Sequence, residues 1–188
     1  MSVFKLGRDR RREVVGAKSK RVQSDNEAVI YLLEGMGAMF KLNGEDIYRA
    51  GPPDLEEIPA KYLPTARQAL DIIRRRILGK YRCDEIFSSL PGGKTFRDLY
   101  YGLDIWINYD PNNDGTDYGW TMPDTFPYDI VITQYTLRMG RWCTVGTIVH
   151  ELAHLNGAPG GDSTAAEDTL KSCGLRSRYG PYEPGVKG

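Results

Sequence analysis

The chain has 188 residues, of which 40% are hydrophobic, and its formal net charge is zero. A chain of this length and composition suits one globular domain, with or without a tail. No apolar run approaches the roughly 20 residues of a membrane-spanning helix, and the N-terminus lacks the apolar core of a cleaved signal peptide. We therefore expect no membrane span, and either a cytoplasmic location or export by a dedicated secretion system.

The first 22 residues form a basic segment, with eight lysines and arginines against Asp9 and Glu13. Such an arm can bind nucleic acid or an acidic partner, or it can be a solvated, mobile leader. No aromatic residues alternate with the charges as base stacking would require. We interpret residues 1–22 as a mobile basic arm, expect no nucleic acid as partner, and expect residues 23–188 to form a single domain.

Three helices are predicted in the first half of that domain. Apolar residues recur at steps of three and four over 25–42, and Asn43-Gly44 follows as a stop. A second helix begins near Pro64-Thr65 and ends at Gly79, with the three arginines at 74–76 facing solvent. A short third helix is predicted over 83–90, before a Pro-Gly-Gly turn.

Two segments then change to a pattern typical of β-strands. Residues 103–109 and 129–135 are rich in β-branched and aromatic side chains and are bounded by turn-forming residues. With the helices before and after them, they predict an α+β fold.

The loop after the first strand invites a metal-binding interpretation. Asp110, Asn112, Asp114 and Gly115 match the opening of a calcium-binding loop, but its twelfth position is Thr121 and not Glu. The same residues are typical of Asx-turns between strands, and we favour that interpretation.

The sequence His-Glu-x-x-His at 150–154 contains both histidines of the chain. Residues four apart lie on one face of a helix, so His150 and His154 can direct two imidazole nitrogens at one zinc ion, with Glu151 beside them. The flanking apolar residues recur at steps of three and four, Thr144 can serve as the N-cap, and Gly157 is a stop. A core helix with two incidental histidines would need buried hydrogen-bond partners for all three side chains.

This motif in its helical context resembles the zincin metallopeptidases, and the resemblance covers about fifteen residues. It implies Zn²⁺ as cofactor, His150 and His154 as metal ligands, and Glu151 as the general base that activates a metal-bound water. It also implies a zincin-like α+β fold, in which helices pack on a small sheet whose edge strand pairs with an extended peptide substrate.

A catalytic zinc usually has three protein ligands, and no third histidine exists. The position used by metzincins, six residues after the second histidine, is Gly160 here. We choose Glu167, on a short helix predicted over 164–174, which resembles the ligand helix of gluzincins and of deuterolysin-like peptidases. Glu167 can instead complete a capping box with Thr164. Asp162, in the preceding Gly-rich loop, is the alternative ligand.

Tyr179 and Tyr182, in the tail after that helix, are candidate donors to the oxyanion that develops during amide hydrolysis. Three cysteines allow either three buried thiols, which we favour, or a Cys143–Cys173 disulfide with Cys83 left as a thiol.

Together these features favour a zinc-dependent endopeptidase that acts on a peptide or protein substrate. One alternative is an exported effector or toxin-type metal amidase that acts on cell-wall or other non-protein amides. Another is a binding module with a structural zinc ion, although such a site has no use for a base at Glu151.

Overall fold

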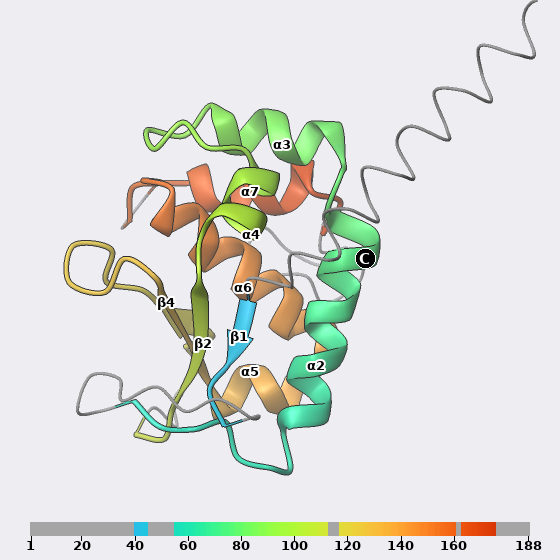
Figure 1. The fold of residues 1–188 in the computed structure, drawn as a ribbon, viewed down its shortest axis with the longest axis vertical. Helices are drawn as coiled ribbons and strands as arrows, with labels where there is room; N and C mark the ends of the chain where they lie inside the picture. The colour runs from blue at the N-terminus through green and yellow to red at the C-terminus, as the bar shows by residue number, and fades with distance from the viewer. Residues whose placement is uncertain (1–39, 45–54, 113–116, 161–162, 176–188) are drawn as a thin grey trace, which may run out of the picture. The chain divides into compact units, whose positions relative to one another are not determined.

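The computed structural model describes residues 40–44, 55–112, 117–160 and 163–175, all of which belong to one compact unit, Ala38–Gly188 (Figure 1). The basic arm at 1–22 lies outside the described residues, as do Asp162, Tyr179 and Tyr182. The described part has a mixed α+β fold, as the sequence predicts. No helix in it is both long enough and apolar enough to cross a membrane.

The sheet has four strands in the order β1-β2-β4-β3. The strands β1 (Phe40–Leu42), β2 (Ile105–Asp110) and β4 (Asp129–Thr133) run parallel, and the edge strand β3 (Gly119–Trp120) runs antiparallel to β4. Nearly all residues of β2 and β4 are buried, as expected for central parallel strands covered on both faces.

The prediction of a helix up to residue 42 is wrong for its last three residues, which form β1. Phe40 and Leu42 are buried and Lys41 between them is partly exposed, which is the alternation of a strand. The segment pairs with Ile105–Ile107 of β2. The helical spacing of apolar residues is overridden here by pairing with a strand more than 60 residues away. The rest of that predicted helix lies outside the described residues.

The predicted helices at 64–79 and 83–90 are confirmed, and two short helices were not foreseen. The helical elements are α2 (Leu63–Ile72), a π-helical turn η1 (Ile73–Ile77), α3 (Tyr81–Ser88), α4 (Phe96–Gly102), α5 (Gln134–Met139), α6 (Arg141–Leu155) and α7 (Ala165–Ser172). The predicted strand at 129–135 ends at Thr133, whose hydroxyl caps α5.

Helix α6, which contains the His-Glu-x-x-His sequence, is the central helix of the unit. It packs against β3, β4, α2, α5 and α7, and ten of its fifteen residues are buried. It begins at Arg141 after Gly140, so the prediction of Thr144 as N-cap is wrong. Thr144 lies one turn inside the helix, where its hydroxyl donates to the Gly140 carbonyl at 3.1 Å.

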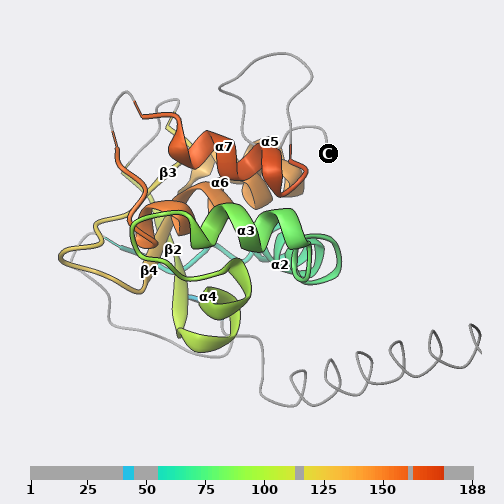
Figure 2. The same cartoon turned by 90° about the horizontal axis from the view of Figure 1, so that it is seen from above.

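The cysteine pairing differs from both sequence-based alternatives. Cys83 of α3 and Cys173 at the end of α7 form a disulfide across a separation of 90 residues, and Cys143 keeps its thiol, buried in α6. The bond joins two helices that pack side by side (Figure 2). Because α3 and α7 are distant in sequence, cysteine spacing alone could not identify this pair.

At the start of the loop after β2, the Asp110 carboxylate accepts a hydrogen bond from the Asn112 backbone N–H at 2.9 Å. This is the Asx-turn arrangement, and Trp120 Nε1 donates to the second oxygen of Asp110 at 3.1 Å. Both contacts hold the loop to the sheet. Asp114 and Gly115 lie outside the described residues.

Candidate metal centre

His150 and His154 present their Nε2 atoms to each other across 3.2 Å. This follows from their spacing on α6, since side chains four residues apart lie one above the other. Two nitrogens bound to one tetrahedral zinc at about 2.0–2.1 Å would be roughly 3.3–3.4 Å apart. The two imidazoles therefore have the separation of a ligand pair.

The second nitrogen of His154 fixes its tautomer. Nδ1 lies 2.9 Å from the Ala158 carbonyl oxygen, which can only accept, so Nδ1 carries the proton and Nε2 presents a lone pair. Burial, and next the neighbouring His154, lower the pKa of His150, while the Glu167 carboxylate acts in the opposite direction. A neutral imidazole is the form that binds a metal ion.

The end of α6 is anchored by Asn156, which is buried directly after the motif. Its side-chain amide donates to the carbonyls of Phe87 and Lys94, at 2.8 and 2.9 Å. Gly157 follows with a φ of +85°, which places the next residues so that the Ala158 carbonyl reaches His154. The predicted stop at Gly157 is thus part of what orients the second histidine.

Helix α7 brings Glu167 to the first of the two imidazoles, that of His150. Its Oε1 lies 3.8 Å from His150 Nδ1, and its Oε2 is buried without a hydrogen-bond partner among the described residues. The alternative role of Glu167 in a capping box is wrong, because Thr164 makes no side-chain cap bond. The Thr164 hydroxyl donates instead to the Asp168 carboxylate at 3.3 Å.

Glu151 lies on the buried side of the same helix and is 6% exposed. Burial raises its pKa to about 7, although a hydrogen bond from Thr121 acts in the opposite direction. The Thr121 hydroxyl donates to Glu151 Oε2 at 3.3 Å. A carboxylate with a pKa near neutrality can both take up and release a proton at physiological pH.

The edge strand β3 lies close against α6 beside Glu151. A Cβ at Gly119 would meet Thr147 Cγ2 and the Val131 carbonyl oxygen, each at 2.6 Å, so only glycine fits there. The preceding residue is fixed through its backbone, since the hydroxyls of Thr133 and Thr136 both donate to the Tyr118 carbonyl. The strand that Thr121 directly follows is therefore held firmly against the helix that carries Glu151.

Sequence reasoning proposed the two histidines, Glu151 and Glu167 as site residues, and it did not include Thr121 and Gly119, which the structure places against Glu151. Neither residue belongs to a local pattern, and both acquire their place only through the pairing of β3 with β4. The placement of Asp162, Tyr179 and Tyr182 remains untested, because these residues lie outside the described ranges.

As placed in the described ranges, no three His, Cys, Asp or Glu side chains converge closely enough to form a complete metal-binding group. Glu167 faces the Nδ1 side of His150 and not the Nε2 side. The donor set still fits a metal: two imidazoles converge, and next to one of them lies a buried carboxylate oxygen that has no hydrogen-bond partner among the described residues.

Comparisons with known proteins do not assign the chain to a family. No family model matches it, and no curated protein and no solved structure is significantly similar to it.

Proposed function

We propose that the protein is a zinc-dependent endopeptidase whose metal ligands are His150, His154 and Glu167. The observation that supports this most is the facing pair of Nε2 atoms at 3.2 Å, on a helix where the buried Glu151 follows His150 directly in the sequence. A structural zinc site needs no carboxylate with a pKa near 7 in that position.

Glu167 is the third ligand in this proposal because its buried Oε2 has no partner among the described residues. For this role the carboxylate would have to move from the Nδ1 side of His150, where it lies, to the Nε2 side. A bound Zn²⁺ would supply a Lewis acid that polarises the scissile carbonyl. Asp162 remains the alternative ligand.

Glu151 acts as the general base in the proposed reaction. It takes a proton from the attacking water and delivers it to the leaving amine, for which a pKa of about 7 suits both directions of transfer. Thr121 is a positioning residue, since its hydroxyl holds one carboxylate oxygen and leaves the other for the water.

The proposed substrate is an extended peptide that pairs with β3. This strand is at the edge of the sheet and runs antiparallel to its neighbour, directly beside the helix that carries the motif. An exposed edge offers main-chain donors and acceptors in the register of a further strand. Together with the resemblance of the motif, this arrangement supports a zincin-like fold.

The test is hydrolysis of casein by the zinc-loaded protein, compared with Glu151→Gln. The variant should keep zinc and fold while activity falls by several orders of magnitude, because an amide cannot accept the proton. Equal activity of the two proteins would show that Glu151 is not the base. A parallel digestion of cell-wall peptidoglycan distinguishes the alternative amidase: activity there and none on casein would replace the peptidase proposal.

A further inference from the structure

A pocket with a volume of about 520 Å³ lies between α2, the π-helical turn and the first turn of α6. Four arginines line it: Arg67, Arg75, Arg76 and Arg141. Ile72 and the half-buried Trp142 supply apolar lining, and Asp71 is the one carboxylate among the described residues that line the pocket. A cavity of this size suits a small molecule or a headgroup.

Among the residues that the structure describes, four arginines and one carboxylate line the pocket, so this lining carries an excess of positive charge. Arginine is always charged, so these groups repel one another at every physiological pH. The protein as a whole has no net charge, which makes this local excess a property of the pocket and not of the composition. An anion in the pocket would offset the repulsion.

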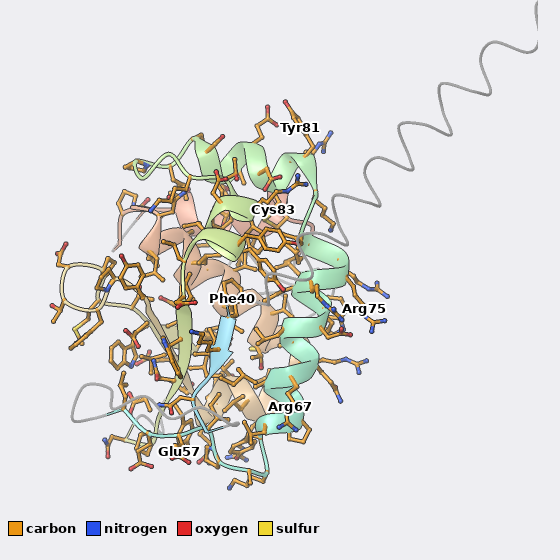
Figure 3. The ribbon with its side chains drawn as sticks, in the orientation of Figure 1. Phe40, Glu57, Arg67, Arg75, Tyr81 and Cys83 are labelled. Carbon is orange, nitrogen blue, oxygen red and sulfur yellow. A yellow bond between two sulfur atoms is a disulfide. The ribbon has the colours of Figure 1, made fainter. Side chains whose placement is uncertain are left out.

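The arginines are held in place by contacts within and across the helices. Arg75 Nε donates to Asp71 at 2.8 Å, and Arg141 of α6 donates to Gln68 of α2 at 3.3 Å. The Arg76 guanidinium lies 5.9 Å from the centre of the Trp142 ring. Figure 3 shows Arg67 and Arg75 at different heights on the same helical segment.

Two local irregularities coincide with the pocket. Arg74–Arg76 belong to the π-helical turn Ile73–Ile77, a rare geometry that recurs at functional sites. Helix α6 begins with Arg141, and its first turn has neither a side-chain cap nor an acidic residue. The positively charged Arg141 therefore lies at the end of the helix where the dipole is also positive. A bound anion would stabilise both features.

We propose that this pocket binds a phosphate monoester carried on an apolar group. A phosphate monoester brings a charge of about −1.5 to −2 and three acceptor oxygens, which matches several guanidinium forks better than a single carboxylate does. The apolar part contacts Ile72 and Trp142. The phosphate can belong to a soluble molecule or to a lipid headgroup.

The site is independent of the proposed peptidase. Trp142 precedes His150 by eight residues on α6, which corresponds to about 12 Å along the helix axis. Loss of zinc or of Glu151 should therefore leave phosphate binding unchanged, and the pocket can be tested on the full-length protein without any substrate.

The experiment is calorimetric titration of the full-length protein with phenyl phosphate at fixed ionic strength, with benzoate as the carboxylate probe. The protein should bind phenyl phosphate saturably and more tightly than benzoate. The Arg75→Gln/Arg141→Gln variant should weaken binding by roughly tenfold for each arginine removed, since each guanidinium contributes charge-assisted hydrogen bonds. The control Arg82→Gln removes the same charge from the exposed surface of α3 and should bind like the parent.

Vesicles that contain phosphatidic acid, compared with vesicles of equal charge made with phosphatidylserine, then identify the source of the phosphate. Preference for phosphatidic acid that depends on Arg75 and Arg141 identifies a lipid headgroup, and binding of phenyl phosphate alone identifies a soluble ligand. The proposal is overturned if phenyl phosphate does not saturate, if benzoate binds as tightly, or if the double variant binds like the Arg82 control.

Discussion

The two ends of α6 differ in how their side chains meet the solvent. Near its C-terminal end, His150 and Glu151 lie among other helices and β3, and burial shifts the pKa of both. At its first turn, Arg141 is exposed beside the other arginines of the pocket. Interactions at the buried end depend on desolvation, whereas those at the exposed end are screened by salt.

This contrast has a practical consequence. Zinc binding and catalysis should depend on single side chains with strict geometry, and anion binding should depend on the summed charge of several arginines. Variants at one end should leave the other function intact. Substitutions at each end of α6, and at a site that belongs to neither, test whether the two ends act independently.

The largest effect is expected at Glu167, the proposed third ligand. Glu167→Gln keeps the size of the side chain but removes the negative oxygen that zinc prefers, so zinc affinity and activity should both be nearly lost. Asp162→Asn serves as the matched variant, and chelator competition measures both. If zinc affinity is unchanged in Glu167→Gln but lost in Asp162→Asn, the third ligand is Asp162 and not Glu167. Binding of phenyl phosphate should be unaffected in both variants.

The disulfide should support the buried end. Cys83–Cys173 holds α7, and thereby Glu167, against α3. Replacing both cysteines by alanine should lower the free energy of unfolding by about 2–4 kcal/mol, as for other bonds that close long loops, and should weaken zinc binding. Thermal unfolding of the parent with and without a reductant measures the contribution of the disulfide to stability. The double alanine variant is the control, because a reductant should not change its melting temperature. An identical melting temperature for the reduced and oxidised parent would contradict it.

Thr121 should affect catalysis without affecting zinc content. Thr121→Val removes the hydroxyl that stabilises ionised Glu151, so the pKa of this carboxyl should rise further above its usual value. The acid limb of the pH–rate profile should move to higher pH, and activity at neutral pH should fall about tenfold. Thr121→Ser keeps the hydroxyl and should behave like the parent. An unchanged pH–rate profile in Thr121→Val would show that Thr121 has no role at Glu151.

The smallest effect is expected at α4, which belongs to neither end. Thr95 and Asp98 form a capping box, and Thr95→Ala should cost about 1 kcal/mol of stability. Hydrogen bonds from the Thr95 side chain and backbone lower the pKa of Asp98 below that of the unfolded chain. Its contribution is therefore full at neutral pH and is lost as the pH falls below about 4, where the carboxylate is protonated. Denaturant unfolding of the parent and of Thr95→Ala at neutral pH and below pH ~4 measures this contribution. The binding of zinc and of phenyl phosphate should be the same in the variant as in the parent.

The sequence predicted those parts of the molecule that depend on local spacing. The facing imidazoles follow from a four-residue step on one helix, and Glu167 was placed on a helix that exists as α7. The capping box of α4 also has a local signature, Thr-x-x-Asp, which went unrecognised.

The sequence did not predict contacts that join distant segments. The Cys83–Cys173 pair, the hydrogen bond from Thr121 to Glu151 and the strand at Phe40–Leu42 all depend on tertiary pairing. The arginine pocket is a further case, because Arg141 lies more than 60 residues after Arg76 in the chain. Pattern-based reasoning sees only one segment at a time, so it could interpret Arg74–Arg76 only as a solvated face.

The most direct test of the central claim is the zinc content of the purified protein, measured by mass spectrometry after zinc loading and removal of unbound metal. We predict about one zinc ion per chain in the parent, and little or none in His150→Ala/His154→Ala, which should also melt at a lower temperature because binding energy contributes to folding. The Arg75→Gln/Arg141→Gln variant should retain its zinc. Full zinc occupancy in the histidine double variant, or no zinc in the parent, would contradict a metal centre at His150 and His154.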